Sequence, residues 1–247
     1  MVIKSIRTLV GFMLVGQIFC AGFFRVRDGI EGEFEMPADE TVNHHLETGN
    51  DITRDYDETE VTETGVDARF VEMLRVNNGG PWGKWGPAKF CQEGSFAVGY
   101  DMKIEPKQLT DNTALNAIKL ICEDQDGKVT GYVTSTEGPW GSWVGQTKCR
   151  KHFYFSSFDL QVEKYQGRMK DDTAANYVKF KCRCRGGRTY ELVKPPGHGL
   201  WGTWGAWSNQ CPNRTAVCGI QTKVEKARGK FRDDTALNDV RFFCCKM

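Results

Sequence analysis

A short tryptophan motif, Trp-Gly-x-Trp, occurs three times in this chain and constrains its fold more than any other feature. Its copies lie at Trp82–Trp85, Trp140–Trp143 and Trp201–Trp204. A second motif, close to Asp-Asp-Thr-Ala-Leu-Asn, follows each copy at residues 111–116, 171–176 and 233–238. Because two motifs that recur in the same order mark repeated supersecondary units, the sequence predicts a threefold domain.

Between the motifs, apolar residues recur at every second position, which is the period of a β-strand. In the first copy one such stretch contains Val98, Tyr100, Met102 and Ile104, and another contains Ile118, Leu120 and Cys122. No stretch beyond residue 66 shows sustained helical periodicity. The sequence therefore predicts an all-β domain of half-buried antiparallel strands, in three equivalent sheets of about four strands each. The domain is predicted at 67–247, with repeats at about 67–126, 127–187 and 188–247.

The first 22 residues are typical of a secretory signal peptide. Lys4 and Arg7 supply positive charge, an apolar run follows at 8–19, and Cys20, Ala21 and Gly22 are small residues suited to cleavage. The apolar run is too short to span a bilayer. We therefore predict a signal peptide at 1–22 and a soluble protein that is secreted to the extracellular space, with no membrane insertion.

Residues 23–66 form an acidic leader of low apolar content. Between residues 28 and 65 there are thirteen Asp or Glu but one basic residue, Arg54. Residues 66–247 instead carry 28 Lys or Arg and 19 Asp or Glu. The leader cannot bury enough apolar surface to fold, so it is predicted to be disordered. It is interpreted either as a solvated tail or as a segment that lies on the basic face of the domain and is later removed.

The repeat also determines the positions of the cysteines. Cys91, Cys149 and Cys211 share one position in successive copies, and Cys122, Cys182 and Cys244 share another. One disulfide inside each copy is therefore predicted: Cys91–Cys122, Cys149–Cys182 and Cys211–Cys244. Each should contribute roughly 3–4 kcal/mol by closing a loop of about thirty residues. Cys218 and Cys245 are predicted to pair with each other, although the exchange Cys211–Cys245 with Cys218–Cys244 stays open because adjacent side chains point to opposite faces.

Cys184 has no counterpart in the other copies. If Cys20 leaves with the signal peptide, nine of the ten cysteines remain and one lacks a partner. Cys184 is therefore predicted to be a free thiol or to form an intermolecular disulfide with a partner protein. A zinc site at Cys182 and Cys184 lacks a second ligand pair, so no metal and no cofactor are predicted.

The acidic turns have a chemical and a structural interpretation. Paired carboxylates serve as the acid and the nucleophile of a glycosidase or as calcium ligands, which makes Asp171, Asp172, Asp233 and Asp234 the candidate catalytic residues. Aspartates in turns also accept hydrogen bonds from nearby backbone amides. The structural role is favoured because it explains all three copies and because Asn112 replaces the second Asp in the first copy.

All seven tryptophans lie in or beside the repeated motif. Two in each copy are predicted to fill the interior of the threefold domain, so that truncation of Trp85 would cost about 3–5 kcal/mol of stability. Trp207 has no counterpart and is the candidate platform for a sugar ring. The glycines that precede the motif, Gly79, Gly80, Gly138 and Gly199, are predicted to lie in turns with positive φ.

Two further features concern the surface. Asn213, Arg214 and Thr215 form an N-glycosylation sequon, and a glycan is predicted on Asn213.

Basic residues gather in one region of the third copy: Lys223, Lys226, Arg228, Lys230 and Arg232. They are interpreted as a solvated face or as a patch for acidic glycans and glycoproteins.

The triplicated Trp-Gly-x-Trp motif, the Asp-Asp-Thr-Ala-Leu-Asn turns and the closing sequence Arg241-Phe-Phe-Cys-Cys245 closely resemble the vitelline membrane outer layer protein family. The resemblance runs from about Val71 to Met247 and does not include the leader. It implies a secreted protein with a type I β-prism fold, in which three Greek-key sheets surround a pseudo-threefold axis. The sequence departs from the family pattern at Asn112, Ala175 and Cys184 and in its leader.

Together these features predict a non-enzymatic protein that is cross-linked by disulfides. It is predicted to help build or coat an extracellular layer by binding glycans or glycoproteins. No nucleic-acid partner is predicted. The alternative is a carbohydrate-active enzyme that acts on chito-oligosaccharide-type glycans through an Asp-lined cleft. Asn112 weakens that alternative, because an amide cannot serve as a general acid or base.

Overall fold

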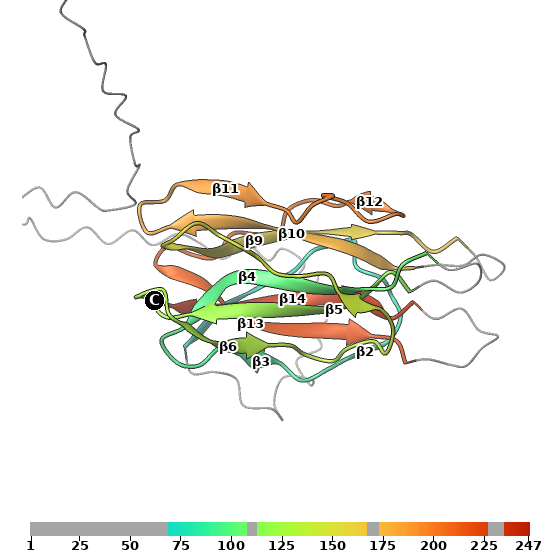
Figure 1. Ribbon diagram of the computed structural model, residues 1–247, viewed down its shortest axis with the longest axis horizontal. Helices are drawn as coiled ribbons and strands as arrows, with labels where there is room; N and C mark the ends of the chain where they lie inside the picture. The colour runs from blue at the N-terminus through green and yellow to red at the C-terminus, as the bar shows by residue number, and fades with distance from the viewer. Residues whose placement is uncertain (1–68, 108–112, 167–172, 227–234) are drawn as a thin grey trace, which may run out of the picture.

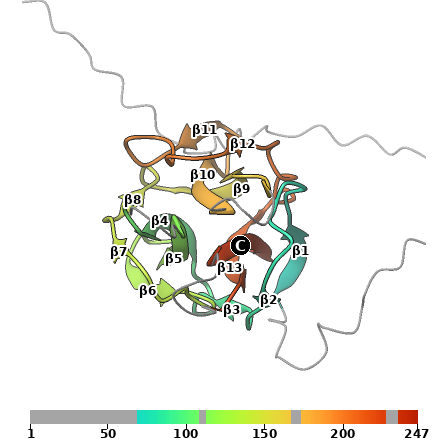
Figure 2. The same cartoon turned by 90° about the vertical axis from the view of Figure 1, so that its right-hand side faces the viewer.

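The computed structural model describes residues 69–107, 113–166, 173–226 and 235–247, which form fourteen β-strands and no helix. These residues accordingly include no helix that is long and apolar enough to cross a membrane. The strands make three antiparallel sheets around a common axis (Figure 1, Figure 2). The molecule is a β-prism, and the all-β class predicted from the period of two is confirmed.

The first two sheets are Greek keys. The first consists of β4 (Phe96–Ile104), β5 (Leu115–Glu123), β6 (Val129–Val133), β7 (Ser142–Trp143) and β8 (Thr147–Lys148). The second consists of β9 (Phe153–Val162), β10 (Ala175–Cys184), β11 (Thr189–Leu192) and β12 (Thr203–Trp204). Their orders are β6-β5-β4-β7, with β8 also on β4, and β11-β10-β9-β12. In each sheet the fourth strand returns to lie beside the first, which defines a Greek key.

The third sheet joins the two ends of the domain. It consists of β13 (Thr215–Val224), β14 (Leu237–Lys246), β1 (Phe70–Leu74), β2 (Lys84–Trp85) and β3 (Lys89–Phe90). The order is β1-β14-β13-β2, and β3 also pairs with β13. β1 runs antiparallel to β14, with Phe70 opposite Cys245. The first described strand therefore closes the ring of sheets against the last, as the end-on view in Figure 2 shows.

Each tryptophan motif lies in the sheet of the preceding copy. β7, which contains Trp143, pairs with β4 of the first copy, and β12, which contains Trp204, pairs with β9 of the second. β2, which contains Trp85, pairs with β13 of the third copy across the closure of the ring. The predicted repeats are therefore not separate sheets, because every sheet is built from strands of two copies.

The interior of the prism is filled by Phe and Tyr side chains of the long strands. The rings of Phe155 and Phe180 stack with centroids 4.0 Å apart, and Phe242 lies edge-on to Phe180 at 5.1 Å. Tyr100 and Phe158 complete a fully buried cluster. All seven tryptophans are described, and each is exposed or half-buried. The prediction that tryptophans fill the interior is therefore wrong, because their motifs belong to edge strands.

The long strands are covered on both faces. Asp159, on the outer face of the second sheet, is only 2% exposed. It lies opposite Lys179, and the ring of Trp204 covers the Lys179 side chain. The prediction of half-buried strands is therefore wrong, because a tryptophan segment from the next copy shields polar residues on the outer face from water.

Four disulfides lie within the described residues: Cys91–Cys122, Cys149–Cys182, Cys211–Cys244 and Cys218–Cys245. They are the four pairs predicted from the phase of the repeat, and they differ from the alternative exchange in the third copy. Each of the first three ties the segment before one long strand to the adjacent long strand of the same copy. Each closes a loop of 31 or 33 residues.

Cys184 is buried at the end of β10 and takes part in a disulfide whose other half lies outside the described residues. The described part of the chain therefore contains no free cysteine. The expectation of a free thiol at Cys184 is wrong. The repeat could not supply its partner, because this cysteine occurs in one copy only.

The location of the core leads to a stability prediction. Phe180→Ala should lower the free energy of unfolding by about 3–5 kcal/mol, because it opens a cavity in the buried cluster. Trp85→Ala should cost about 1–2 kcal/mol, because the ring is only partly buried. Guanidinium denaturation with the disulfides intact measures both. Equal losses in the two variants would contradict the placement of the core.

Candidate functional site

The second repeated motif builds the same turn at one end of all three sheets. In the first copy Glu105 Oε2 accepts hydrogen bonds from Thr113 Oγ1 at 2.6 Å and from the Thr113 amide at 3.2 Å. Asn116 Nδ2 then donates to Thr113 Oγ1 at 2.7 Å. The bond between Thr Oγ1 and Glu recurs at Thr173 and Glu163 with 2.8 Å, and at Thr235 and Glu225 with 2.7 Å. The motif is therefore a structural element of the fold.

The backbone of this turn is unusual and also repeats. Ala114, Ala174 and Ala236 have φ of 48°, 49° and 48°, in the left-handed region that alanine seldom adopts. Each alanine carbonyl accepts a hydrogen bond from the amide of the turn glutamate, at 2.8 Å in all three copies. The Glu–Thr–Asn contacts thus hold a strained residue in place. The same strained turn therefore recurs at this end of all three sheets.

The glycines around the tryptophan motif permit close backbone approaches. A Cβ on Gly138 would lie 2.4 Å from Asn116 Oδ1, although Gly138 does not have a positive φ. A Cβ on Gly79, Gly80 or Gly199 would likewise lie closer than 3.0 Å to a neighbouring atom, and none of these glycines has a positive φ. The positive φ predicted at all four positions is therefore wrong. The glycine inside the motif does have a positive φ, 77° at Gly141, and a Cβ there would lie 2.4 Å from the Ile104 carbonyl.

The second tryptophan of each motif lies flat under a cation. Lys119 Nζ is 3.7 Å from the ring centre of Trp143, and Lys179 Nζ is 4.6 Å from that of Trp204. The Arg241 guanidinium is 3.8 Å from Trp85. Each cation follows the asparagine of the turn by three residues. These cation–π contacts attach the edge segment to the outer face of the sheet, which is a structural role.

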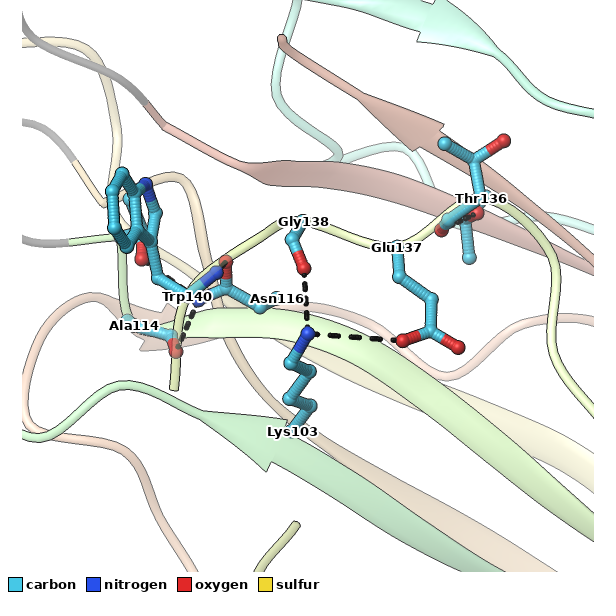
Figure 3. A network of polar contacts seen from close by, with 9 residues as sticks. Lys103, Ala114, Asn116, Thr136, Glu137, Gly138 and Trp140 are labelled. Carbon is cyan, nitrogen blue, oxygen red and sulfur yellow. Dashed lines mark hydrogen bonds and ion pairs between the residues drawn. The ribbon is translucent and has the colours of Figure 1, made fainter. Parts of the chain in front are cut away.

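The first tryptophan of each motif is held by its backbone, and two of the three rings are largely exposed. The amides of Trp82, Trp140 and Trp201 donate to Oδ1 of Asn238, Asn116 and Asn176, each at 3.2 Å. Figure 3 shows this contact for Trp140, beside Lys103, which donates to the Gly138 carbonyl and pairs with Glu137. The Trp82 and Trp140 side chains are 41% and 48% exposed. One end of the prism therefore presents to solvent two tryptophan rings whose backbone amides are hydrogen-bonded to the turn asparagines.

Trp82 has an aromatic partner from another sheet. Tyr165, just after β9, lies edge-on to Trp82, with ring centroids 5.8 Å apart and an interplanar angle of 74°. Tyr165 is 53% exposed. The equivalent residue in the first copy is Lys107, so the aromatic pair breaks the threefold symmetry. Two exposed rings at a steep angle form an L-shaped surface.

A cavity of about 250 Å³ lies beside Trp201 at the same end. Its walls include Tyr177, His198, Leu200 and Glu105. The Tyr177 hydroxyl donates to the Lys194 carbonyl at 2.9 Å, and burial raises the pKa of this phenol above its usual value. The cavity is therefore apolar with a few polar groups at its rim, a composition common in ligand pockets.

The residues predicted from the sequence fall in several places. Asp171, Asp172, Asp233 and Asp234 lie outside the described residues, as do Arg228, Lys230 and Arg232. Trp207 lies beneath Lys181 Nζ at 4.4 Å, on the outer face of the second sheet and away from the prism end. Asn213 is exposed in the turn before β13, and its glycosylation stays a prediction.

Sequence reasoning missed the turn glutamates and Tyr165. Glu105, Glu163 and Glu225 occupy one phase of the repeat, so the repeat contained a signal for them. Tyr165 occurs in one copy only and had no such signal. The turn is fixed by these glutamates together with Thr and Asn, all of which the structure describes.

One carboxyl near this end has an altered acidity. Gly79 packs against the Asp239 side chain, and burial raises the Asp239 pKa to about 6. The Val240 amide, which donates to Asp239 Oδ1 at 2.8 Å, and the charges of Lys223, Arg241 and Arg75 oppose this rise. Between about pH 4 and 6 the folded protein therefore retains a proton that an unfolded Asp releases, so stability falls as pH rises through this range.

Asp239→Asn should remove this penalty. At pH 7.5 the free energy of unfolding should rise by about 1–2 kcal/mol, and its decline between pH 4 and 6 should flatten. Denaturation curves at several pH values measure both effects. Asp126→Asn, in an exposed hairpin turn, is the control and should leave the pH dependence unchanged. A variant that is less stable than the wild type at pH 7.5 would contradict the raised pKa.

The sequence of the prism matches a family of known proteins. The family model described as vitelline membrane outer layer protein I matches residues 72–247. The vitelline membrane outer layer protein 1 homolog of Mus musculus is 43% identical over 184 residues, 73% of this chain and 86% of the relative. That of Homo sapiens is 43% identical over 182 residues, 72% of this chain and 84% of the relative.

Among solved structures, the artocarpin–mannopentose complex has a TM-score of 0.43 at 13% identity and covers 72% of this chain and 98% of that chain. A mannose-specific jacalin-related lectin from Morus nigra has a TM-score of 0.42 at 15% identity and covers 74% and 99%. The family match and the two 43% identical relatives both span the prism. The chain therefore belongs to the vitelline membrane outer layer protein I family.

Proposed function

We propose that the protein is a secreted structural component of an extracellular layer and that it binds carbohydrate at the tryptophan end of its prism. Its relatives are named for the outer layer of the vitelline membrane. Four disulfides fasten the described domain, which suits a protein that works outside the cell. The charged and apolar start of the chain would direct it into the secretory pathway.

The observation that carries the proposal is the pair formed by Trp82 and Tyr165. Each ring exposes more than two fifths of its surface although it is large and apolar. An exposed aromatic group that packing does not require is a usual sign of a binding surface. The Asn238 contact holds the Trp82 backbone and the edge-on contact with Tyr165 restricts its ring, so less conformational entropy would be lost when a ligand binds.

Carbohydrate is the ligand class that fits this surface best. One face of a pyranose ring consists of C–H groups that carry slight positive charge, and the face of an aromatic ring is slightly negative. Two rings at 74° would contact two sides of one sugar or two successive sugars of a chain. Trp140, mounted in the same way on the neighbouring sheet, would extend the surface for a longer glycan.

Substitutions in the aromatic pair test the proposal. Trp82→Ala and Tyr165→Ala should each weaken binding of an N-acetylchito-oligosaccharide about tenfold, because each removes a stacking contact of about 1.4 kcal/mol. Isothermal titration measures the affinity, and a glycan array of the wild type identifies the preferred sugar.

Tyr132→Ala is the matched control, because Tyr132 in β6 is 52% exposed, much as Tyr165 is. It should bind as the wild type does. The proposal fails if the wild type binds no glycan on the array. It also fails if the two variants of the aromatic pair bind as tightly as Tyr132→Ala does.

A further inference from the structure

A second cavity, of about 570 Å³, opens at the other end of the prism. Tyr154 near the start of β9, Cys184 at the end of β10 and Thr215 at the start of β13 line it. The turn glutamates and Trp82 lie at the opposite ends of these strands. The cavity is therefore separated from the proposed carbohydrate surface by the length of a ten-residue strand, roughly 30 Å.

The walls of this cavity are positively charged. Arg183, Arg185 and Arg214 line it together with the apolar side chains of Phe155 and Met247. The Arg183 guanidinium donates to the carbonyls of Cys211, Pro212 and Thr215 at 2.7–2.8 Å, so its hydrogen-bond partners are neutral groups. Within the described parts of the chain, none of these three arginines forms an ion pair.

A hairpin beside this cavity carries three carboxylates, and within the described residues none of them forms an ion pair with the cavity's arginines. Glu123, Asp124 and Asp126 influence the Tyr154 phenol at the cavity wall. Glu123 pairs with Lys148 Nζ at 2.9 Å, and Asp124 Oδ1 accepts the amides of Asp126 and Lys128. Arg185 also acts on the Tyr154 phenol and donates to Gln125 Oε1 of the hairpin at 2.6 Å, so these carboxylates offset part of the cavity's charge without pairing with an arginine.

The described chain begins beside the cavity. The carbonyl of Arg69 accepts a hydrogen bond from the Lys246 amide, and the next amide, that of Met247, donates to the Arg214 carbonyl at 3.0 Å. Met247 itself lines the cavity. The acidic residues that precede Arg69 in the sequence are therefore attached at the rim of the arginine-lined cavity.

We propose that this cavity is a binding site for acidic peptide and that residues 55–63 of the same chain occupy it. This segment carries Asp55, Asp57, Glu58, Glu60 and Glu63, and Glu63 precedes Arg69 by only six residues. A tether of that length gives the segment a local concentration on the order of millimolar at the cavity. Arginines without an ion-pair partner and an acidic segment attract each other at this range. An external acidic ligand has to displace the leader before it can bind.

Trypsin provides a test in the full chain, because Arg54 is the only Lys or Arg between residues 28 and 65. A bound segment 55–63 shields the bond after Arg54. At 50 mM salt, cleavage at Arg54 should be at least fivefold faster in the double variant Arg185→Gln/Arg214→Gln than in the wild type. The difference should vanish at 500 mM salt, where ion pairs at the surface are screened. Mass spectrometry of the released fragment measures the rate.

The matched control is Lys84→Gln/Lys107→Gln, which removes two exposed positive charges at the opposite end of the prism. It should leave the cleavage rate unchanged, and equal melting temperatures show that all variants are folded. Equal acceleration in both double variants would mean that the overall charge of the domain attracts the leader, and would overturn the proposal. Unchanged cleavage in Arg185→Gln/Arg214→Gln would also overturn it. Carbohydrate takes no part in this assay, so its outcome is independent of the proposed function.

Discussion

The exchange of tryptophan segments between copies is the interaction on which the rest of the structure depends. Each pair of long strands obtains its edge strand from the copy that follows, and the third pair obtains its edge strand from the first copy through closure of the ring. A single copy would leave an unpaired edge and polar outer-face residues such as Asp159 exposed to water. Three copies are therefore the smallest number that satisfies every sheet in this arrangement.

The same exchange separates the two tryptophans of each motif into different roles. The second ring lies under a cation and fastens the segment to the sheet, whereas the first projects from the end of the prism. The asparagine of the turn connects these roles, because its amide group caps the turn and its oxygen binds the backbone of the first tryptophan. A motif that the fold requires thus also mounts the surface proposed to bind carbohydrate, and Tyr165 distinguishes one of its three copies.

Much of the fold could be predicted because it is local or repeated. The period of two identified the strands, and the phase of the repeat paired eight cysteines. The position of the tryptophans could not be predicted, because the same motif fits both a strand that faces the axis and a strand at the edge of a sheet. That choice depends on pairing between distant copies. Features that occur in one copy only could not be inferred from the repeat. They are the disulfide of Cys184, the ring of Tyr165, and the packing of Asp239 against Gly79.

The closing strand has a mechanical consequence. β1 contains no cysteine, whereas its neighbour β14 carries Cys244 and Cys245, both in disulfides. Because the first residue of β1, Phe70, lies opposite Cys245, a pull applied at Arg69 would open the ladder from that end, one pair at a time. The disulfides keep β13 and β14 together meanwhile. A pull at this point would therefore detach one strand while the rest of the prism stays cross-linked, and the strand would pair again once the pull ends.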